Sequence, residues 1–244
     1  MRMPLVYGHR GAAIEAPENT LPSFKLAKKL GVYGVEMDLH TSKDGELIVM
    51  HDETLDRTTN GSGLIHLHTI EEIKRLDAGF KFGKRWKGTR VSTLREVFEG
   101  LGRINYYLEI KQSSKIYPGI EEKMLNLISE FNLKNNVQII SFDFDSLEIV
   151  RELDKTIITG LLYTGKSSWF IDIAKTLKIN FLQPSFNLIY QEDIEIARKN
   201  GFKVAAWTVD TVEEIKRAID LKVDSITSNN PRLVLRMLKR YAKL

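Results

Sequence analysis

Short apolar runs alternate with amphipathic segments along the whole chain. The apolar runs occupy residues 4–7, 33–37, 46–50, 104–110, 137–141, 157–162, 181–182, 204–207 and 225–227. Runs of this length between glycines and polar residues predict β-strands. Apolar residues at helical spacing predict helices over residues 21–30, 94–101, 120–131, 144–153, 169–177, 191–199, 213–218 and 231–241. The first helix stops at Gly31, and Asn19 or Thr20 can cap it.

The order of these elements predicts the fold class. Eight strand–helix units fill the 244 residues, as an α/β protein with a (β/α)8 TIM barrel requires. The run at 46–50 follows a turn at Lys43–Gly45 and predicts a hairpin return of the second strand. Residues 52–91 are polar, contain one short predicted helix at 69–76, and form a small insertion after strand two. We expect a single domain over residues 1–244, with a doubly wound open sheet as the alternative.

Composition limits the class of protein. The chain is 43% hydrophobic and 28% charged, which is ordinary for a soluble globular protein. It has no cysteine, so disulfides and thiolate metal sites are excluded. We see no cleavable signal, and no apolar run approaches the roughly 20 residues that span a bilayer. We therefore expect a cytoplasmic location without stable membrane insertion; the sequence does not define an oligomeric state.

Charge adds little to this picture. The net charge of +4 and the pI near 9.0 mildly favour anionic partners. The lysines are scattered, and the one concentrated segment is residues 81–87, which is basic with interleaved aromatics. We interpret that segment as a solvated loop beside a site for an anionic small molecule. We expect no nucleic-acid partner.

Two of the five histidines lie in unusual positions. His9 and His51 each follow an apolar run, and each is next to a charged residue. An imidazole at the end of a strand is poorly placed for core packing and well placed for a cleft. His40, His66 and His68 fit an ordinary structural or surface role. His9 and His51 are therefore candidates for proton transfer.

Three carboxylates also lie at predicted strand ends. Glu36 and Asp38 are two residues apart on one strand, so their side chains point to the same face. Glu109 ends the next barrel strand and can supply a third oxygen. An all-oxygen site suits Mg²⁺ or Ca²⁺, with Mn²⁺ also compatible. A pair of exposed acids without a metal is the alternative for Glu36 and Asp38.

Two cations complete the candidate chemistry. Lys111 shares its strand face with Glu109, and Arg10 follows His9. Arg and Lys together suit a phosphate group, although Lys111 could also form a salt bridge to the carboxylates. Two histidines, a metal site and a phosphate site indicate acid–base catalysis at phosphorus. Ser141 lacks a Gly-x-Ser-x-Gly elbow, and no Gly-rich loop with Gly-Lys-Ser/Thr is present.

Short motifs follow one another in a specific order along the chain. They are His9-Arg10-Gly11, Pro17-Glu18-Asn19-Thr20, Glu36-x-Asp38, His51-Asp52, the segment at 55–61, Glu109-x-Lys111, Ser141-Phe142-Asp143 and Trp207-Thr208-Val209-Asp210. This ordered set resembles the glycerophosphodiester phosphodiesterase family and extends to Pro231. The resemblance implies a TIM barrel that cleaves glycerophosphodiesters to glycerol 3-phosphate and an alcohol.

The resemblance also implies roles for individual residues. A divalent metal would lie on Glu36, Asp38 and Glu109, and His9 and His51 would form the acid–base pair. Which histidine is the acid stays open, as does direct attack by water against formation of a cyclic phosphate.

Further residues are expected to contact the substrate or to support those that do. Arg10 and Lys111 would bind phosphate, and Trp207 is expected on the substrate. Glu18 would orient His9 or Arg10, or else act as first-turn helix charge.

The chain departs from the family pattern at two places. Ser92 stands where proline is usual, and Ser228-Asn229 replaces a Thr-Asp pair, which puts the hydrogen bonding of the last loop in question. Alternatives within enzymes are a lysophospholipase D or a lipid phosphodiesterase of the sphingomyelinase D or phosphoinositide phospholipase C kind. From another class, the alternative is a barrel that binds phosphate esters without turnover.

Overall fold

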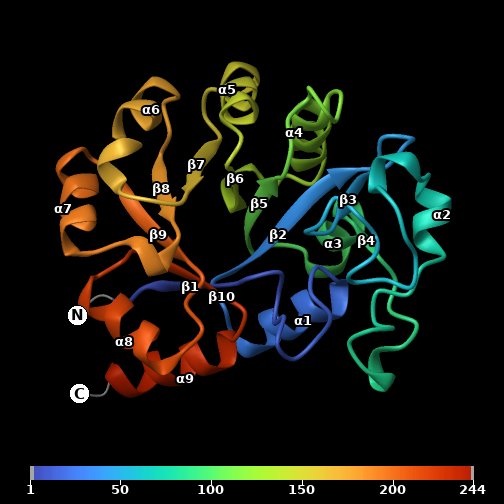
Figure 1. Cartoon of the computed structure of the whole chain (residues 1–244), viewed down its shortest axis with the longest axis horizontal. Coiled ribbons are helices and arrows are strands. Elements are labelled where there is room, and N and C mark those ends of the chain that lie inside the picture. The colour runs from blue at the N-terminus through green and yellow to red at the C-terminus, as the bar shows by residue number, and fades with distance from the viewer. Residues whose placement is uncertain (1–2, 243–244) are drawn as a thin grey trace.

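A closed ring of eight parallel strands forms the centre of the molecule (Figure 1). The computed structural model describes residues 3–242. Around the ring the strands are β1 (Leu5–Gly8), β2 (Gly34–Thr41), β5 (Asn105–Ile110), β6 (Val137–Ser141), β7 (Ile158–Tyr163), β8 (Phe181–Pro184), β9 (Lys203–Trp207) and β10 (Ser225–Ser228). Because β1 pairs with both β2 and β10, the sheet closes and the predicted TIM barrel is confirmed.

Helices cover the outside of the ring, one after each barrel strand (Figure 1). They are α1 (Leu21–Leu30), α3 (Leu94–Leu101), α4 (Ile120–Glu130), α5 (Phe144–Leu153), α6 (Ile171–Thr176), α7 (Gln191–Lys199), α8 (Val212–Asp220) and α9 (Pro231–Tyr241). Their apolar faces pack on the outward residues of the strands and form the largest core. In the described part of the chain, no helix is both long and apolar enough to cross a membrane.

Aromatic and aliphatic side chains fill the lower interior of the barrel. The cluster comes from six strands and consists of Tyr7, Tyr107, Ile140, Leu162, Phe181 and Ala205. The rings of Tyr7 and Tyr107 are stacked with centroids 3.8 Å apart. A Cβ atom at Gly34 would lie 2.4 Å from the Tyr7 ring, so this layer requires glycine there. The floor of the barrel is thus closed, and polar chemistry can only lie above it.

The hairpin after the second barrel strand matches its prediction. β3 (Leu47–Val49) returns antiparallel to β2, and the two-residue β4 (Ser92–Thr93), which the apolar pattern does not predict, pairs with β3. The insertion between them contains α2 (Ile70–Lys74), shorter than the predicted helix at 69–76, and packs on a small core of its own.

The capping of α1 differs from the sequence prediction. Thr20 is the N-cap residue, but its hydroxyl donates to the Pro17 carbonyl and does not cap the helix. The first backbone N–H of the helix, that of Leu21, instead donates to the hydroxyl of Ser92 at 3.1 Å. Ser92 can serve this role because, unlike the proline usual at its position, it has a hydroxyl.

Candidate active site

Strand parity stacks the polar side chains above the aromatic floor. Tyr107, Glu109 and Lys111 alternate along one line, so all three face inward at increasing height. Asp38 is the register partner of Glu109, which brings the carboxylates of two strands together. The mouth at the carboxyl ends of the strands therefore begins with a carboxylate layer and continues with cations.

The predicted metal ligands converge. Oxygens of Glu36, Asp38 and Glu109 lie within 4.8 Å of one another, and all three residues are buried. Burial together with repulsion from Asp38 raises the pKa of Glu109 to about 7 and raises that of Glu36 as well. Burial would also raise the pKa of Asp38, but Lys111 and Arg10 bring it below its ordinary value.

One position in the predictions needs correction. Glu36 and Asp38 do not end their strand, because β2 continues to Thr41. The extra residues pair antiparallel with β3, with Leu39 opposite Val49 and Thr41 opposite Leu47. The parallel ladder to β5 ends at Leu39, so the two acids still lie near the mouth end of the barrel.

The two predicted phosphate contacts lie directly beside the acids. Lys111 Nζ is 2.7 Å from a Glu109 oxygen and 3.3 Å from an Asp38 oxygen. Arg10 donates its backbone N–H to Glu36 at 2.9 Å, and its guanidinium lies 3.4 Å from Asp38. Both cations therefore bind carboxylates here, as the salt-bridge alternative for Lys111 stated. Both side chains also retain some exposure, at 17%, towards the mouth.

His9 is held by a neutral amide. Its Nδ1 lies 2.7 Å from Asn229 Oδ1, and Asn229 Nδ2 donates to Asp210 Oδ2 at 2.7 Å. Since the carboxylate of Asp210 only accepts, the amide oxygen must face His9, and His9 carries its proton on Nδ1. Its Nε2 then faces Glu36 at 3.8 Å. Burial and the neighbouring Arg10 lower the pKa of His9 to about 4, so the ring is neutral.

His51 is held by a carboxylate. Its Nδ1 donates to Asp52 at 2.7 Å, and Asp52 in turn accepts from Arg57 at 2.7 Å. The hydrogen bond from Arg57 lowers the pKa of Asp52 to about 2. His51 and His9 also lower the pKa of Asp38, after Lys111 and Arg10.

Glu18 links the two halves of the mouth. It accepts from Arg10 at 2.9 Å and from both terminal nitrogens of Arg57 at 2.9 and 2.7 Å. It lies before α1, so its alternative as a first-turn helix charge is wrong. Of its two predicted partners, the structure pairs it with Arg10 and not with His9.

Several supporting residues were not predicted as part of the site. Asn19 donates to Asp38 at 2.7 Å from a backbone with φ of 56°, which asparagine tolerates. His40 is buried: its Nε2 donates to the backbone carbonyl of His51 at 3.0 Å, and its Nδ1 lies 2.7 Å from the Tyr117 hydroxyl. The structural role expected for His40 thus consists of holding the loop that carries His51.

Trp207 lies at the carboxyl end of β9. Its indole N–H donates to the Gln183 carbonyl at 2.9 Å, and its ring meets that of Phe142 edge to face at 5.5 Å. Phe142 is 44% exposed. The two rings form an apolar wall at the mouth, where a bound substrate could lie.

Comparison with known proteins identifies the family of this barrel. Residues 9–233 match the model of the glycerophosphoryl diester phosphodiesterase family. A glycerophosphodiester phosphodiesterase of Caldanaerobacter subterraneus is 42% identical, covering 97% of this chain and 98% of that protein. One of Bacillus subtilis is 35% identical, covering 97% and 87%. The chain therefore belongs to the glycerophosphoryl diester phosphodiesterase family.

Solved structures agree. An Oleispira antarctica phosphodiesterase in complex with the product sn-glycerol-3-phosphate superposes with a TM-score of 0.88 at 28% identity, covering 97% of both chains. A glycerophosphodiester phosphodiesterase of Thermotoga maritima gives a TM-score of 0.80 at 25% identity over 97% of this chain and 99% of that one.

Proposed function

We propose that this enzyme hydrolyses water-soluble glycerophosphodiesters to glycerol 3-phosphate and an alcohol. The observation that carries the proposal is the convergence of His9, with its Nε2 free, on the buried carboxylates Glu36, Asp38 and Glu109. The family supports the reaction class, and the neighbour bound to sn-glycerol-3-phosphate supports the product. A small-molecule substrate also fits a mouth closed below by the aromatic floor.

The carboxylate cluster fits a divalent metal. Its donors are all oxygens, and Glu36 Oε1 is buried without a hydrogen-bond partner among the described residues. An orphaned carboxylate oxygen is costly unless a cation binds it. Mg²⁺ and Ca²⁺ prefer such ligands, and Mn²⁺ accepts them. A bound ion would supply positive charge to the phosphoryl oxygens and withdraw electron density from phosphorus.

The remaining positive charge comes from the protein. Arg10 presents a fork of donors and Lys111 a point charge, both at the level just above the carboxylates. Lys111 is paired with Glu109 and Asp38, and the Arg10 guanidinium is paired with Asp38 and with Glu18. If a bound metal shared the charge of Asp38 and Glu109, both cations could turn towards a phosphate in the mouth and stabilise the negative charge that develops on it.

Different partners suit the histidines to different roles. The neutral amide of Asn229 keeps the His9 proton on Nδ1, so its Nε2 lone pair can accept a proton from the attacking hydroxyl, whether of water or of the substrate glycerol. The carboxylate of Asp52 accepts the Nδ1–H of His51 and can stabilise the positive charge that this ring would carry as an acid, so its Nε2–H can protonate the leaving alkoxide. The P–O bond to the leaving alcohol breaks as the bond to the attacking oxygen forms. Attack by water gives glycerol 3-phosphate directly, whereas attack by the glycerol hydroxyl gives a cyclic phosphate that a water molecule must then open.

A product assay tests the proposal. Purified enzyme is incubated with glycerophosphocholine, glycerophosphoethanolamine, glycerophosphoglycerol and a lysophospholipid, with and without chelator, and products are identified by mass spectrometry. We expect glycerol 3-phosphate and the free alcohol from the soluble diesters only in the presence of metal. Turnover of the lysophospholipid alone would indicate the lysophospholipase D alternative, and no turnover of any substrate would contradict the proposal.

A further inference from the structure

Two neighbouring helices carry an excess of positive charge. α1 and α9 lie far apart in sequence but pack side by side on the barrel wall (Figure 1). Their solvent-exposed cations are Lys25, Lys28, Lys29, Arg232, Arg236, Lys239 and Arg240, and neither helix contains an acidic residue. We call these seven residues the basic face. The sequence alone shows only scattered cations, because the fold is what brings the two helices together.

The seven cations of the basic face exceed the net positive charge of the protein, which is +4. The chain has 36 Lys and Arg against 32 Asp and Glu, so without these seven cations the acids are in excess. The adjoining helices are weakly acidic: α8 has three acidic residues against two basic ones, and α3 has two against one. Within residues 3–242, only Arg232 of the seven forms an ion pair, with Glu15. The charge is therefore concentrated on one side and largely unneutralised.

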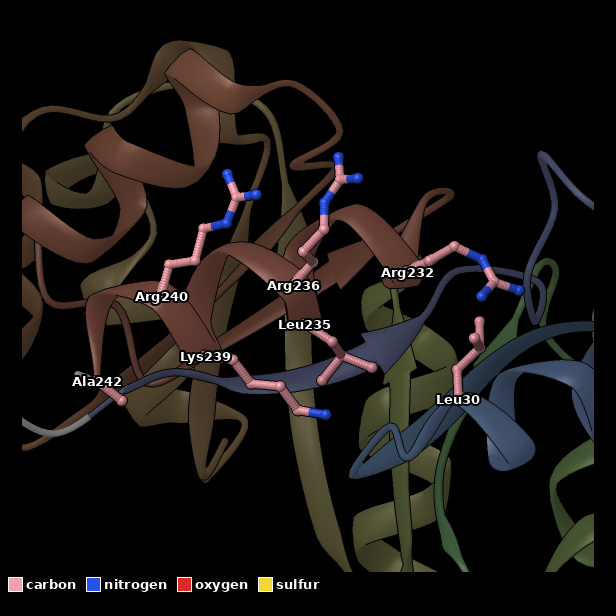
Figure 2. A pocket seen from close by; sticks show the side chains of 7 residues that line it. All are labelled: Leu30, Arg232, Leu235, Arg236, Lys239, Arg240 and Ala242. Carbon is pink, nitrogen blue, oxygen red and sulfur yellow. The ribbon is translucent and has the colours of Figure 1, made fainter.

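A groove runs along this face. It encloses about 610 Å³, and Leu30 of α1 and Leu235 of α9 contribute apolar surface between the cations. Figure 2 shows Arg236 and Arg240 extending from α9 in the same direction, one helical turn apart, with Lys239 leaving the helix on the other side of Leu235. The groove thus combines the apolar surface of two leucines with the long basic side chains of arginine and lysine.

We infer that the basic face docks the enzyme on an anionic phospholipid bilayer. Clustered Lys and Arg near such a surface are attracted by its negative potential. The long side chains can reach lipid phosphates while the two leucines rest among the headgroups. Among residues 3–242 no helix is long and apolar enough to cross a membrane, and the contact that we infer is peripheral and reversible.

The choice of a lipid surface rests on the proposed function, because glycerophosphodiesters are the soluble products of phospholipid deacylation. Docking through the barrel wall also fits the geometry. α9 begins at the mouth, where Arg232 binds Glu15, and runs down the side of the barrel. The mouth therefore stays open to solvent, where diesters released by an acyl hydrolase of the membrane would be most concentrated.

Vesicle sedimentation tests the inference with the full chain. We expect binding to phosphatidylcholine vesicles containing roughly one-third phosphatidylglycerol at about 0.05 M salt, none to phosphatidylcholine alone, and release near 0.5 M salt, where the Debye length is short. Reversing three charges, Arg236→Glu with Lys239→Glu and Arg240→Glu, should weaken binding at least tenfold. A matched variant with Lys155→Glu, Lys199→Glu and Lys203→Glu has the same net charge and should bind like the wild type.

Several outcomes would contradict the inference. Equal loss in both variants would mean that binding depends only on net charge. Equal binding to neutral vesicles, no binding at low salt, or tighter binding to a duplex oligonucleotide at the same salt would rule out an anionic bilayer as the partner. Turnover of soluble glycerophosphocholine, measured without vesicles, should be the same in both variants and the wild type. If none of the three turns it over, the proposed function fails, while the vesicle measurement still decides whether the basic face binds an anionic bilayer.

Discussion

The side-chain oxygen of Asn229 lies 2.7 Å from Nδ1 of His9, and the amide nitrogen of the same residue lies 2.7 Å from Asp210. Asp210 also accepts from the Ser228 hydroxyl at 2.8 Å and from the backbone N–H of Asn229 at 2.7 Å. The asparagine that replaces the usual aspartate therefore keeps the loop connected. Because the carboxylate of Asp210 only accepts hydrogen bonds, it fixes the orientation of the Asn229 amide. The amide oxygen then accepts from Nδ1 of His9 and thereby sets the tautomer of that ring.

Exchanging these two residues tests this arrangement. Asn229→Ala should lower kcat about tenfold with little change in KM, since a lost hydrogen bond of about 1.4 kcal/mol misplaces His9. Asn229→Asp alone places two carboxylates together and should be impaired as well. The double variant Asp210→Asn with Asn229→Asp can remake every hydrogen bond and should recover most of kcat. If the double variant is no better than Asn229→Asp at equal melting temperature, the connection does not act on His9.

Metal binding should stabilise the fold as well as activate the enzyme. Glu36, Asp38 and Glu109 repel one another in the barrel, and a bound divalent ion relieves this repulsion. The melting temperature of chelator-treated protein should rise on addition of Mg²⁺, Ca²⁺ or Mn²⁺. Asp38→Asn should fold but lose most of that rise. Full activity after exhaustive chelation, with no metal found by elemental analysis, would refute a metal role.

Lys111 should contribute to both binding and catalysis. A lysine on the phosphate in the ground state and the transition state affects both terms, so Lys111→Ala should raise KM and lower kcat. Loss of one charge-assisted hydrogen bond, about 1.5–3 kcal/mol, corresponds to roughly tenfold to a hundredfold in kcat/KM. Lys115→Ala, which removes an exposed lysine from the following loop, is the control. Unchanged kinetics for Lys111→Ala would contradict a role in binding phosphate and would mean that Lys111 only forms salt bridges to Glu109 and Asp38.

Asp52 should stabilise the fold at neutral pH and lose this effect in acid. Its pKa is about 2 in the folded protein against an ordinary 3.8, because Arg57 and then His51 bind the ionised form. The contribution is present above about pH 4 and disappears as the pH falls towards 2. Because the side chain is partly exposed, we expect about 1 kcal/mol or less.

Urea unfolding of wild type and Asp52→Asn at pH 6 and pH 3 measures this effect. The difference in unfolding free energy should shrink at the lower pH. Asp172→Asn, at an exposed position in α6, should show no comparable change. A difference that is constant between the two pH values would mean that the Asp52 charge does not stabilise the fold.

The fold was largely predictable because its elements are local. Period and length of the apolar runs define the strands and helices, and α9 begins and ends where the spacing predicts. The site residues on barrel strands were predictable for a related reason: strand parity aligns Glu109 with Lys111. β4 was not, because a two-residue pairing leaves no apolar pattern.

Hydrogen bonds between residues that are far apart in the sequence could not be predicted from the sequence pattern. Asn229 is 220 positions from His9, and Tyr117 is 77 from His40. Nothing local in the sequence marks such a pair, since the hydrogen bond exists only once the barrel has closed. The position of Asn19 in the sequence predicts a helix cap, but in the structure its side chain donates a hydrogen bond to Asp38. The basic face was equally invisible, because it joins the first and last helices.

The central claim is that His9 and His51 exchange protons with the substrate in distinct roles, His9 as base and His51 as acid. The most direct measurement compares kcat of His9→Ala and His51→Ala, both folded and metal-loaded, on glycerophosphocholine and on a nitrophenyl ester of glycerol phosphate. On glycerophosphocholine each should lose at least about a hundredfold. The nitrophenyl leaving group needs no acid, so His51→Ala should recover on that ester while His9→Ala stays impaired. Near-wild-type kcat of either variant on glycerophosphocholine would contradict the account.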